Sequence, residues 1–123
     1  MTSVLTGARR FLVVEDEAMI ALLVEDYLSD LGHVMAWQAD TIEDALQLVQ
    51  DQPDIDGALL DMNLHGQPVD PVAAALAERG IPFCFITGRG IDAATRHPLA
   101  PVVGKPFTIG SLRAAIGLLF PSA

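Results

Sequence analysis

The chain has 123 residues, of which 51% are hydrophobic, and this is enough for one domain with a buried core. Its formal net charge of −9 argues against nucleic acid as a direct partner, because such binding depends on clustered Lys and Arg. No apolar run approaches the roughly 20 residues of a membrane span and the N-terminus lacks a signal peptide, so we expect a cytoplasmic protein with no membrane partner.

The first third of the chain reads as a strand, an acidic turn and a helix. Residues 11–14 form a continuous apolar run, typical of a strand buried on both faces of a parallel sheet. The run ends at three acidic residues, 15–17. Apolar residues then recur at helical spacing until Gly32, a natural helix stop. These residues are Ile20, Leu23, Val24, Tyr27, Leu28 and Leu31.

The next segment predicts a second strand and a second helix. Residues 33–39 favour a strand, although its pattern is weaker than that of the first. Thr41 and Asp44 are spaced as a capping arrangement ahead of an amphipathic helix that runs to about Asp51.

A third strand and a third helix follow. Residues 57–60 predict a strand that ends at Asp61, and a polar loop through Gly66 and Pro68 then leads to an alanine-rich helix over 72–79.

The last third predicts two more strands and a final helix. Residues 82–86 favour a fourth strand ending at Thr87; Cys84 lies within it and is expected to be a core residue. The segment 88–98 leaves room for only a short fourth helix. Residues 102–103 form a brief fifth strand before Lys105, and apolar residues from 109 to 119 line one face of the last helix.

Five strands alternating with helices predict a doubly wound α/β fold with helices on both faces of a parallel sheet. Residues 1–10 are expected to be a loosely ordered lead-in, and we expect no attached output domain.

Polar side chains occupy the ends of the predicted strands. Ligands in open parallel α/β sheets bind at the carboxyl ends of the strands, so these residues should converge. Clustered carboxylates repel one another unless a cation lies between them, and oxygen ligands favour magnesium. An ammonium and a hydroxyl beside them suit a phosphoryl group. The residues concerned are Glu15, Asp16, Asp61, Thr87 and Lys105.

The motifs at 12–17 (Leu-Val-Val-Glu-Asp-Glu), 60–63 (Leu-Asp-Met-Asn) and 104–107 (Gly-Lys-Pro-Phe) together resemble response-regulator receiver domains. The resemblance spans nearly the whole chain. It implies a flavodoxin-like, five-stranded parallel sheet of strand order 2-1-3-4-5, with the receiver domain over residues 11–120.

The resemblance also implies a metal site for Mg²⁺ or Mn²⁺. Asp16 would bind the metal directly and Glu15 through water, while Asn63 would contribute its backbone carbonyl. Asp61 would be both a metal ligand and the phosphoacceptor.

Thr87 and Lys105 would contact the phosphoryl group by the same resemblance. The side chains of Asn63 and Arg89 would flank the water that hydrolyses the acyl phosphate. His65 is expected to be an ordinary loop histidine, with modulation of that hydrolysis as the alternative.

The implied function is that of a single-domain response regulator, phosphorylated on Asp61 by a histidine kinase or a phosphotransfer protein and signalling by protein contact. Such a protein is no enzyme beyond its own phosphorylation and dephosphorylation. Residues 82–88 resemble a proteobacterial subgroup with a Phe-Ala-Thr-Gly signature, whose members tend to work with HWE-type kinases. Val102 departs from the family, because receivers usually carry Tyr or Phe there, and this puts the usual switch in doubt.

Two alternatives stay open. A phosphorylation-independent adaptor would keep the fold and lose the switch, as Val102 suggests. A metal-dependent phosphatase would need a second acid two residues after the nucleophile, where this chain has Asn63.

Overall fold

The computed structural model describes residues 7–88 and 97–121. Its elements in chain order are β1 (Arg10–Val14), α2 (Ala18–Asp30), β2 (Val34–Ala39), α3 (Ile42–Asp51), β3 (Gly57–Asp61), β4 (Asn63–Leu64), β5 (Gln67–Pro68), α4 (Asp70–Glu78), β6 (Phe83–Thr87), β7 (Val102–Gly104) and α5 (Ile109–Leu119).

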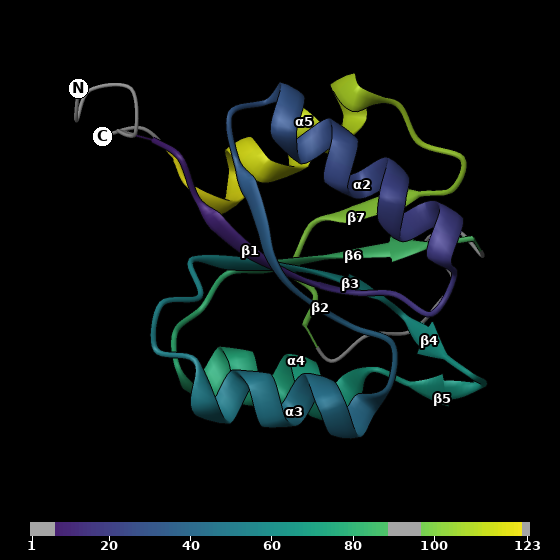
Figure 1. The fold of residues 1–123 in the computed structure, drawn as a ribbon, viewed down its shortest axis with the longest axis vertical. Coiled ribbons are helices and arrows are strands. Elements are labelled where there is room, and N and C mark those ends of the chain that lie inside the picture. The colour runs from purple at the N-terminus through teal and green to yellow at the C-terminus, as the bar shows by residue number, and fades with distance from the viewer. Residues whose placement is uncertain (1–6, 89–96, 122–123) are drawn as a thin grey trace.

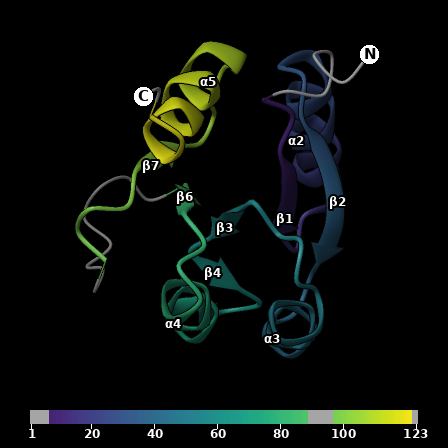
Figure 2. The ribbon, with the colours of Figure 1, turned by 90° about the vertical axis from the view of Figure 1, so that its left-hand side faces the viewer.

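Five parallel strands form the central sheet in the order β2-β1-β3-β6-β7, which is the predicted order 2-1-3-4-5. Helices α2 and α5 cover one face of the sheet and α3 and α4 cover the other, as Figures 1 and 2 show. The described part of the chain therefore has the predicted doubly wound α/β fold. No helix within it is long and apolar enough to cross a membrane.

Each central strand contributes side chains to two separate cores, because successive residues of a strand point to opposite faces. In β3, Ala58 and Leu60 pack in the core under α3 and α4, whereas Leu59 packs in the core under α2 and α5. Strand β6 divides in the same way, and its Cys84 is fully buried, as predicted. The continuous apolar runs of the sequence thus reflect burial on both faces of the sheet.

Hydroxyl caps begin two of the helices. Thr41 Oγ1 accepts a hydrogen bond from the backbone N–H of Asp44 at 3.1 Å, as its spacing predicted. Thr108 and Ser111 form a reciprocal capping box at α5, with two backbone-to-hydroxyl bonds of 3.0 Å. This cap sets where α5 leaves the loop that carries Lys105.

The structure differs from the sequence-based expectations in two details. Strand β1 begins at Arg10, inside the expected lead-in, because its backbone pairs with β2. The expected polar loop after Asp61 contains a small antiparallel hairpin, β4–β5, in which Asn63 pairs with Pro68 and Leu64 with Gln67. The short helix expected within 88–98 lies largely outside the described residues.

Candidate functional site

The acidic run after β1 lies beside the end of β3. The backbone N–H of Glu15 bonds to the carbonyl of Ala39 at 3.0 Å, which extends the β1–β2 pairing by one residue. Glu17 is the N-cap of α2, and its N–H donates to Glu15 Oε2 at 3.1 Å. The chain turns sharply here and presents its acidic side chains to the carboxyl edge of the sheet.

Four carboxylates meet at this edge. One oxygen from each side chain lies within 4.8 Å of the others, in the group Glu15, Asp16, Glu17 and Asp61. Glu15 is only 2% exposed and Asp61 8% exposed. Such a set of oxygen donors is the type that binds a hard divalent cation.

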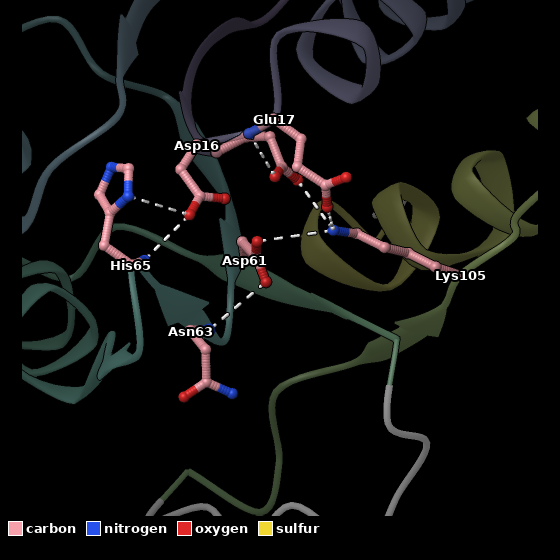
Figure 3. Close-up of polar contacts among 7 residues, drawn as sticks. Asp16, Glu17, Asp61, Asn63, His65 and Lys105 are labelled. Atoms are coloured by element: carbon pink, nitrogen blue, oxygen red, sulfur yellow. Dashed lines mark hydrogen bonds and ion pairs between the residues drawn. The ribbon is translucent and has the colours of Figure 1, made fainter.

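Lys105 enters the cluster from the loop after β7, as Figure 3 shows. Its Nζ lies 3.2 Å from Glu15 Oε1, 3.3 Å from Glu17 Oε1 and 3.5 Å from Asp61 Oδ2. The backbone holds the loop in place, because the N–H of Lys105 donates to the carbonyl of Thr87 at 2.7 Å. One ammonium is therefore shared among three carboxylates.

The electrostatics of the cluster favour an additional cation. Burial raises the pKa of Glu15 to about 7, and the nearby charge of Asp61 adds to the rise. Burial alone would lower the pKa of Lys105, but attraction to Glu15 and Asp61 outweighs it and the pKa is raised, so Lys105 stays charged. Glu15 Oε1 is buried without a hydrogen-bond partner among the described residues, since its contact with Lys105 is an ion pair. These residues fit a divalent metal ion.

Asp16 is held by a backbone hydrogen bond from the loop that follows β3, and not by Lys105. Its Oδ2 accepts a hydrogen bond from the backbone N–H of His65 at 2.9 Å. Burial tends to raise the pKa of Asp16, but this hydrogen bond and its other polar contacts outweigh burial and lower the pKa. Asp16 is therefore a carboxylate over the neutral pH range.

Asp61 has a polar neighbour at each oxygen. Oδ2 faces Lys105, and Oδ1 accepts a 3.4 Å hydrogen bond from the backbone N–H of Asn63. The Asn63 side chain points away from Asp61 in Figure 3. A cavity of about 440 Å³ opens above these groups. It is lined by Asp16, Glu17, Asp61, Asn63, His65, Gly66, Thr87, Gly88 and Lys105.

Comparisons with known proteins agree with this geometry. The chain matches no protein-family model. SdrG from Sphingomonas melonis Fr1 is 41% identical with a TM-score of 0.81, over 91% of this chain and 96% of that one. The receiver domain of the response regulator PhyR from Erythrobacter litoralis is 29% identical with a TM-score of 0.76, over 94% and 96% of the two chains. The chain belongs to the family of response-regulator receiver domains. A probable chemotaxis protein CheY from Rhizobium etli is also similar, at 26% identity over 90% of this chain and 92% of its own length.

As a receiver domain, the chain belongs to two-component signalling. The structure brings the predicted site residues together. Glu15 lies in the carboxylate cluster and pairs with Lys105. The others line the cavity: Asp16, Asp61, Asn63, Thr87 and Lys105. Thr87 ends β6 and is buried. Arg89 lies outside the described residues.

Two contacts of the site were not anticipated from the sequence. Glu17 contacts Lys105, although it was not among the predicted site residues. The His65 amide binds Asp16 from 49 residues away, and a short hairpin turn places it there. Only the pair His65-Gly66, between Leu64 and Gln67, could have indicated that turn.

Proposed function

We propose that this receiver domain is a single-domain response regulator that accepts a phosphoryl group on Asp61 from a phosphohistidine of a histidine kinase or a phosphotransfer protein. The observation that carries the proposal is the placement of Lys105 Nζ, 3.5 Å from Asp61 Oδ2 at the floor of an open, polar cavity. A charged ammonium beside a carboxylate nucleophile can neutralise an incoming phosphoryl group.

The reaction is a direct transfer between two side chains. A carboxylate oxygen of Asp61 attacks the phosphorus in line with the bond to the imidazole nitrogen. The new P–O bond forms as the P–N bond breaks, and the imidazole keeps the electron pair of the broken bond. Asp61 becomes an acyl phosphate. Attack by water later releases inorganic phosphate and restores the carboxylate.

Lys105 and Thr87 are the proposed phosphoryl contacts. Lys105 can exchange part of its ion pairing with Glu15 and Glu17 for pairing with the phosphoryl oxygens. The hydroxyl of Thr87, at the end of β6, lines the same cavity and can donate to another oxygen. The backbone N–H of Asn63 already donates to Asp61 and orients its carboxylate.

A divalent ion, Mg²⁺ or Mn²⁺, is the proposed cofactor. Asp16, Glu15, Asp61 and the backbone carbonyl of Asn63 would hold it, and it would neutralise the developing charge on the transferred group. Glu15 Oε1 is buried without a hydrogen bond and has only the shared Lys105 ammonium as its cationic neighbour, which supports a cation at this position.

The output is proposed to be a changed protein surface and not a released metabolite. SdrG, for which a structure in a BeF3-activated conformation exists, is 43% identical over 89% of this chain and 94% of its own, with a TM-score of 0.75. The BeF3-activated conformation of that relative supports the phosphorylation proposed here. The kinase is proposed to be of the HWE type, on the resemblance of residues 82–88 to the Phe-Ala-Thr-Gly subgroup.

The test is phosphorylation of the purified protein by acetyl phosphate with Mg²⁺, followed by intact mass. We expect one added phosphoryl group that requires Mg²⁺ and is absent from Asp61→Asn. The matched control is Asp26→Asn, which removes the same charge from an exposed position on α2 and should be phosphorylated normally. No modification of the wild type, together with partner binding that Asp61→Asn leaves intact, would favour the phosphorylation-independent adaptor.

A further inference from the structure

The hairpin that follows Asp61 ends in a tight left-handed turn. His65 has a φ of 51° and Gly66 a φ of 81°, and they connect the paired strands β4 and β5. Two consecutive residues with positive φ are typical of the two-residue turn that matches the twist of a hairpin. Glycine adopts this conformation freely, whereas histidine is strained in it.

This turn presents a backbone donor to the acidic cluster. The N–H of His65 points at Asp16 Oδ2 and donates to it at 2.9 Å, and the imidazole Nδ1 lies 3.6 Å from the same oxygen (Figure 3). The amide makes the directed hydrogen bond, because Nδ1 at 3.6 Å is beyond hydrogen-bonding distance of that oxygen.

The rest of the hairpin is fixed to the core. Leu64 and Val69 are buried under α3 and α4, and the N–H of Val69 donates to the carbonyl of Met62 at 2.9 Å. The position of the His65 amide therefore depends on the turn conformation and not on a mobile side chain.

We propose that His65 is a positioning residue for the metal ion: its amide, aimed by the left-handed turn, occupies Oδ2 of Asp16 and leaves Oδ1 as the oxygen available to the cation. This inference rests on the proposed function, because it assigns a role toward the same metal. A hydrogen bond that fixes a ligating carboxylate restricts its rotation, and loss of such partners typically weakens metal binding by roughly 10- to 100-fold.

The inference predicts a rank order set by backbone preference. Asn and Gly adopt positive φ readily, Ala does so less well, and β-branched Val is strongly disfavoured there. None of these substitutions removes the amide itself. Affinity for Mg²⁺ should therefore decrease in the order Gly and Asn, Ala, Val, whatever happens to the imidazole.

The experiment is calorimetric titration of the full chain with Mg²⁺, for the wild type and four variants: His65→Gly, His65→Asn, His65→Ala and His65→Val. The midpoint of thermal unfolding is measured for each of them as well. We expect His65→Val to bind Mg²⁺ about tenfold more weakly than His65→Asn. Phosphorylation of His65→Val by acetyl phosphate should recover at saturating Mg²⁺. His65→Ala provides the milder comparison if the Val variant fails to fold.

A control separates metal positioning from general stability. Gly80 also has a positive φ, at 71°, with open space around it, and it follows α4 away from the site. Gly80→Ala should lower the thermal midpoint and leave Mg²⁺ affinity unchanged.

Two outcomes would overturn the inference. If Mg²⁺ affinity stays flat across the His65 series while the thermal midpoint falls, the turn is structural only. If Asn and Gly weaken binding as much as Val, the imidazole and not the amide is the relevant group. Absence of Mg²⁺ binding by the wild type would instead refute the proposed function, so the two failures are distinguishable.

Discussion

Lys105 Nζ lies 3.2 Å from Glu15 Oε1, and this ion pair joins the end of β7 to the end of β1 across the carboxyl edge of the sheet. Both side chains are largely covered, at 16% and 2% exposure. Water screens such a pair poorly, so each partner strongly affects the charge state and ion affinity of the other.

Lys105→Met should separate metal binding from phosphoryl transfer. Removing the ammonium leaves the carboxylates without their internal cation, so Mg²⁺ should bind several-fold more tightly in a calorimetric titration. Phosphorylation by acetyl phosphate at saturating Mg²⁺ should nevertheless slow by about 100-fold, because the group that neutralises the phosphoryl oxygens is lost. Arg113→Met, which removes a cation from the exposed surface of α5, should change neither quantity. Weaker Mg²⁺ binding by Lys105→Met would contradict the model of competition between ammonium and metal.

Glu15→Gln should change stability in a pH-dependent way. The pKa of Glu15 is about 7 in the folded protein against an ordinary 4.5, so the folded state favours the neutral acid. This favourable contribution is complete below pH 4.5 and is lost as the pH rises through 7. With a chelator present to remove divalent metal ions, the free energy of unfolding of the variant at pH 8 should therefore exceed that of the wild type by about 2 kcal/mol.

At pH 5 the stability gained by Glu15→Gln over the wild type should be much smaller, because wild-type Glu15 is already largely protonated in the folded state there. Denaturant unfolding at both pH values measures the difference. Mg²⁺ should reduce or reverse the gain at pH 8, because a bound cation favours the charged carboxylate. An equal gain at the two pH values would show that burial of charge is not the cause.

Gly57→Ala should destabilise the domain. A Cβ at this buried position would lie 3.0 Å from Phe11 Cε2 and 3.0 Å from Phe120 Cζ, so an aromatic ring would have to move. Overpacking of this kind costs about 1–3 kcal/mol of unfolding free energy.

Gly117→Ala is the matched control for this substitution. Gly117 is exposed within α5 and has open space around it, so Ala should stabilise the helix by about 0.5–1 kcal/mol. Denaturant unfolding of the two variants should therefore give changes of opposite sign, and two changes of the same sign would rule out crowding at Gly57 as the cause.

Thr108→Ala should cost about 1 kcal/mol of stability, because it removes the acceptor for the Ser111 N–H at the start of α5. Thr108→Ser keeps the hydroxyl and should retain most of the wild-type unfolding free energy in the same measurement. Equal losses in the two variants would mean that the methyl group, and not the cap, is important.

The sequence predicted the sheet well because its central strands are buried on both faces, whereas the strand order was implied by the family resemblance. Runs such as 11–14 leave little ambiguity, and in a parallel sheet their ends must meet at one edge. The convergence of Glu15, Asp61 and Lys105 follows from that rule together with the family resemblance.

The remaining features depend on contacts that no local pattern encodes. The hairpin after Asp61 has strands of two residues each, too short for a periodic signal. Every residue except proline has a backbone amide, so the residue type at 65 could not indicate the hydrogen bond to Asp16. That bond is seen only in the folded chain. Glu17 is typical of a helix start, and only the position of Lys105 gives it a partner.

Strand β3 is enclosed on both faces and paired on both edges, by β1 and β6. Opening its backbone to solvent requires breaking both cores, so the amides of Leu59 and Leu60 should be among the slowest in the protein to exchange with deuterium. The residue proposed to receive the phosphoryl group thus ends a strand whose backbone is expected to be among the best protected in the domain. Phosphorylation should leave exchange there nearly unchanged and alter it in the loops that follow β3 and β6.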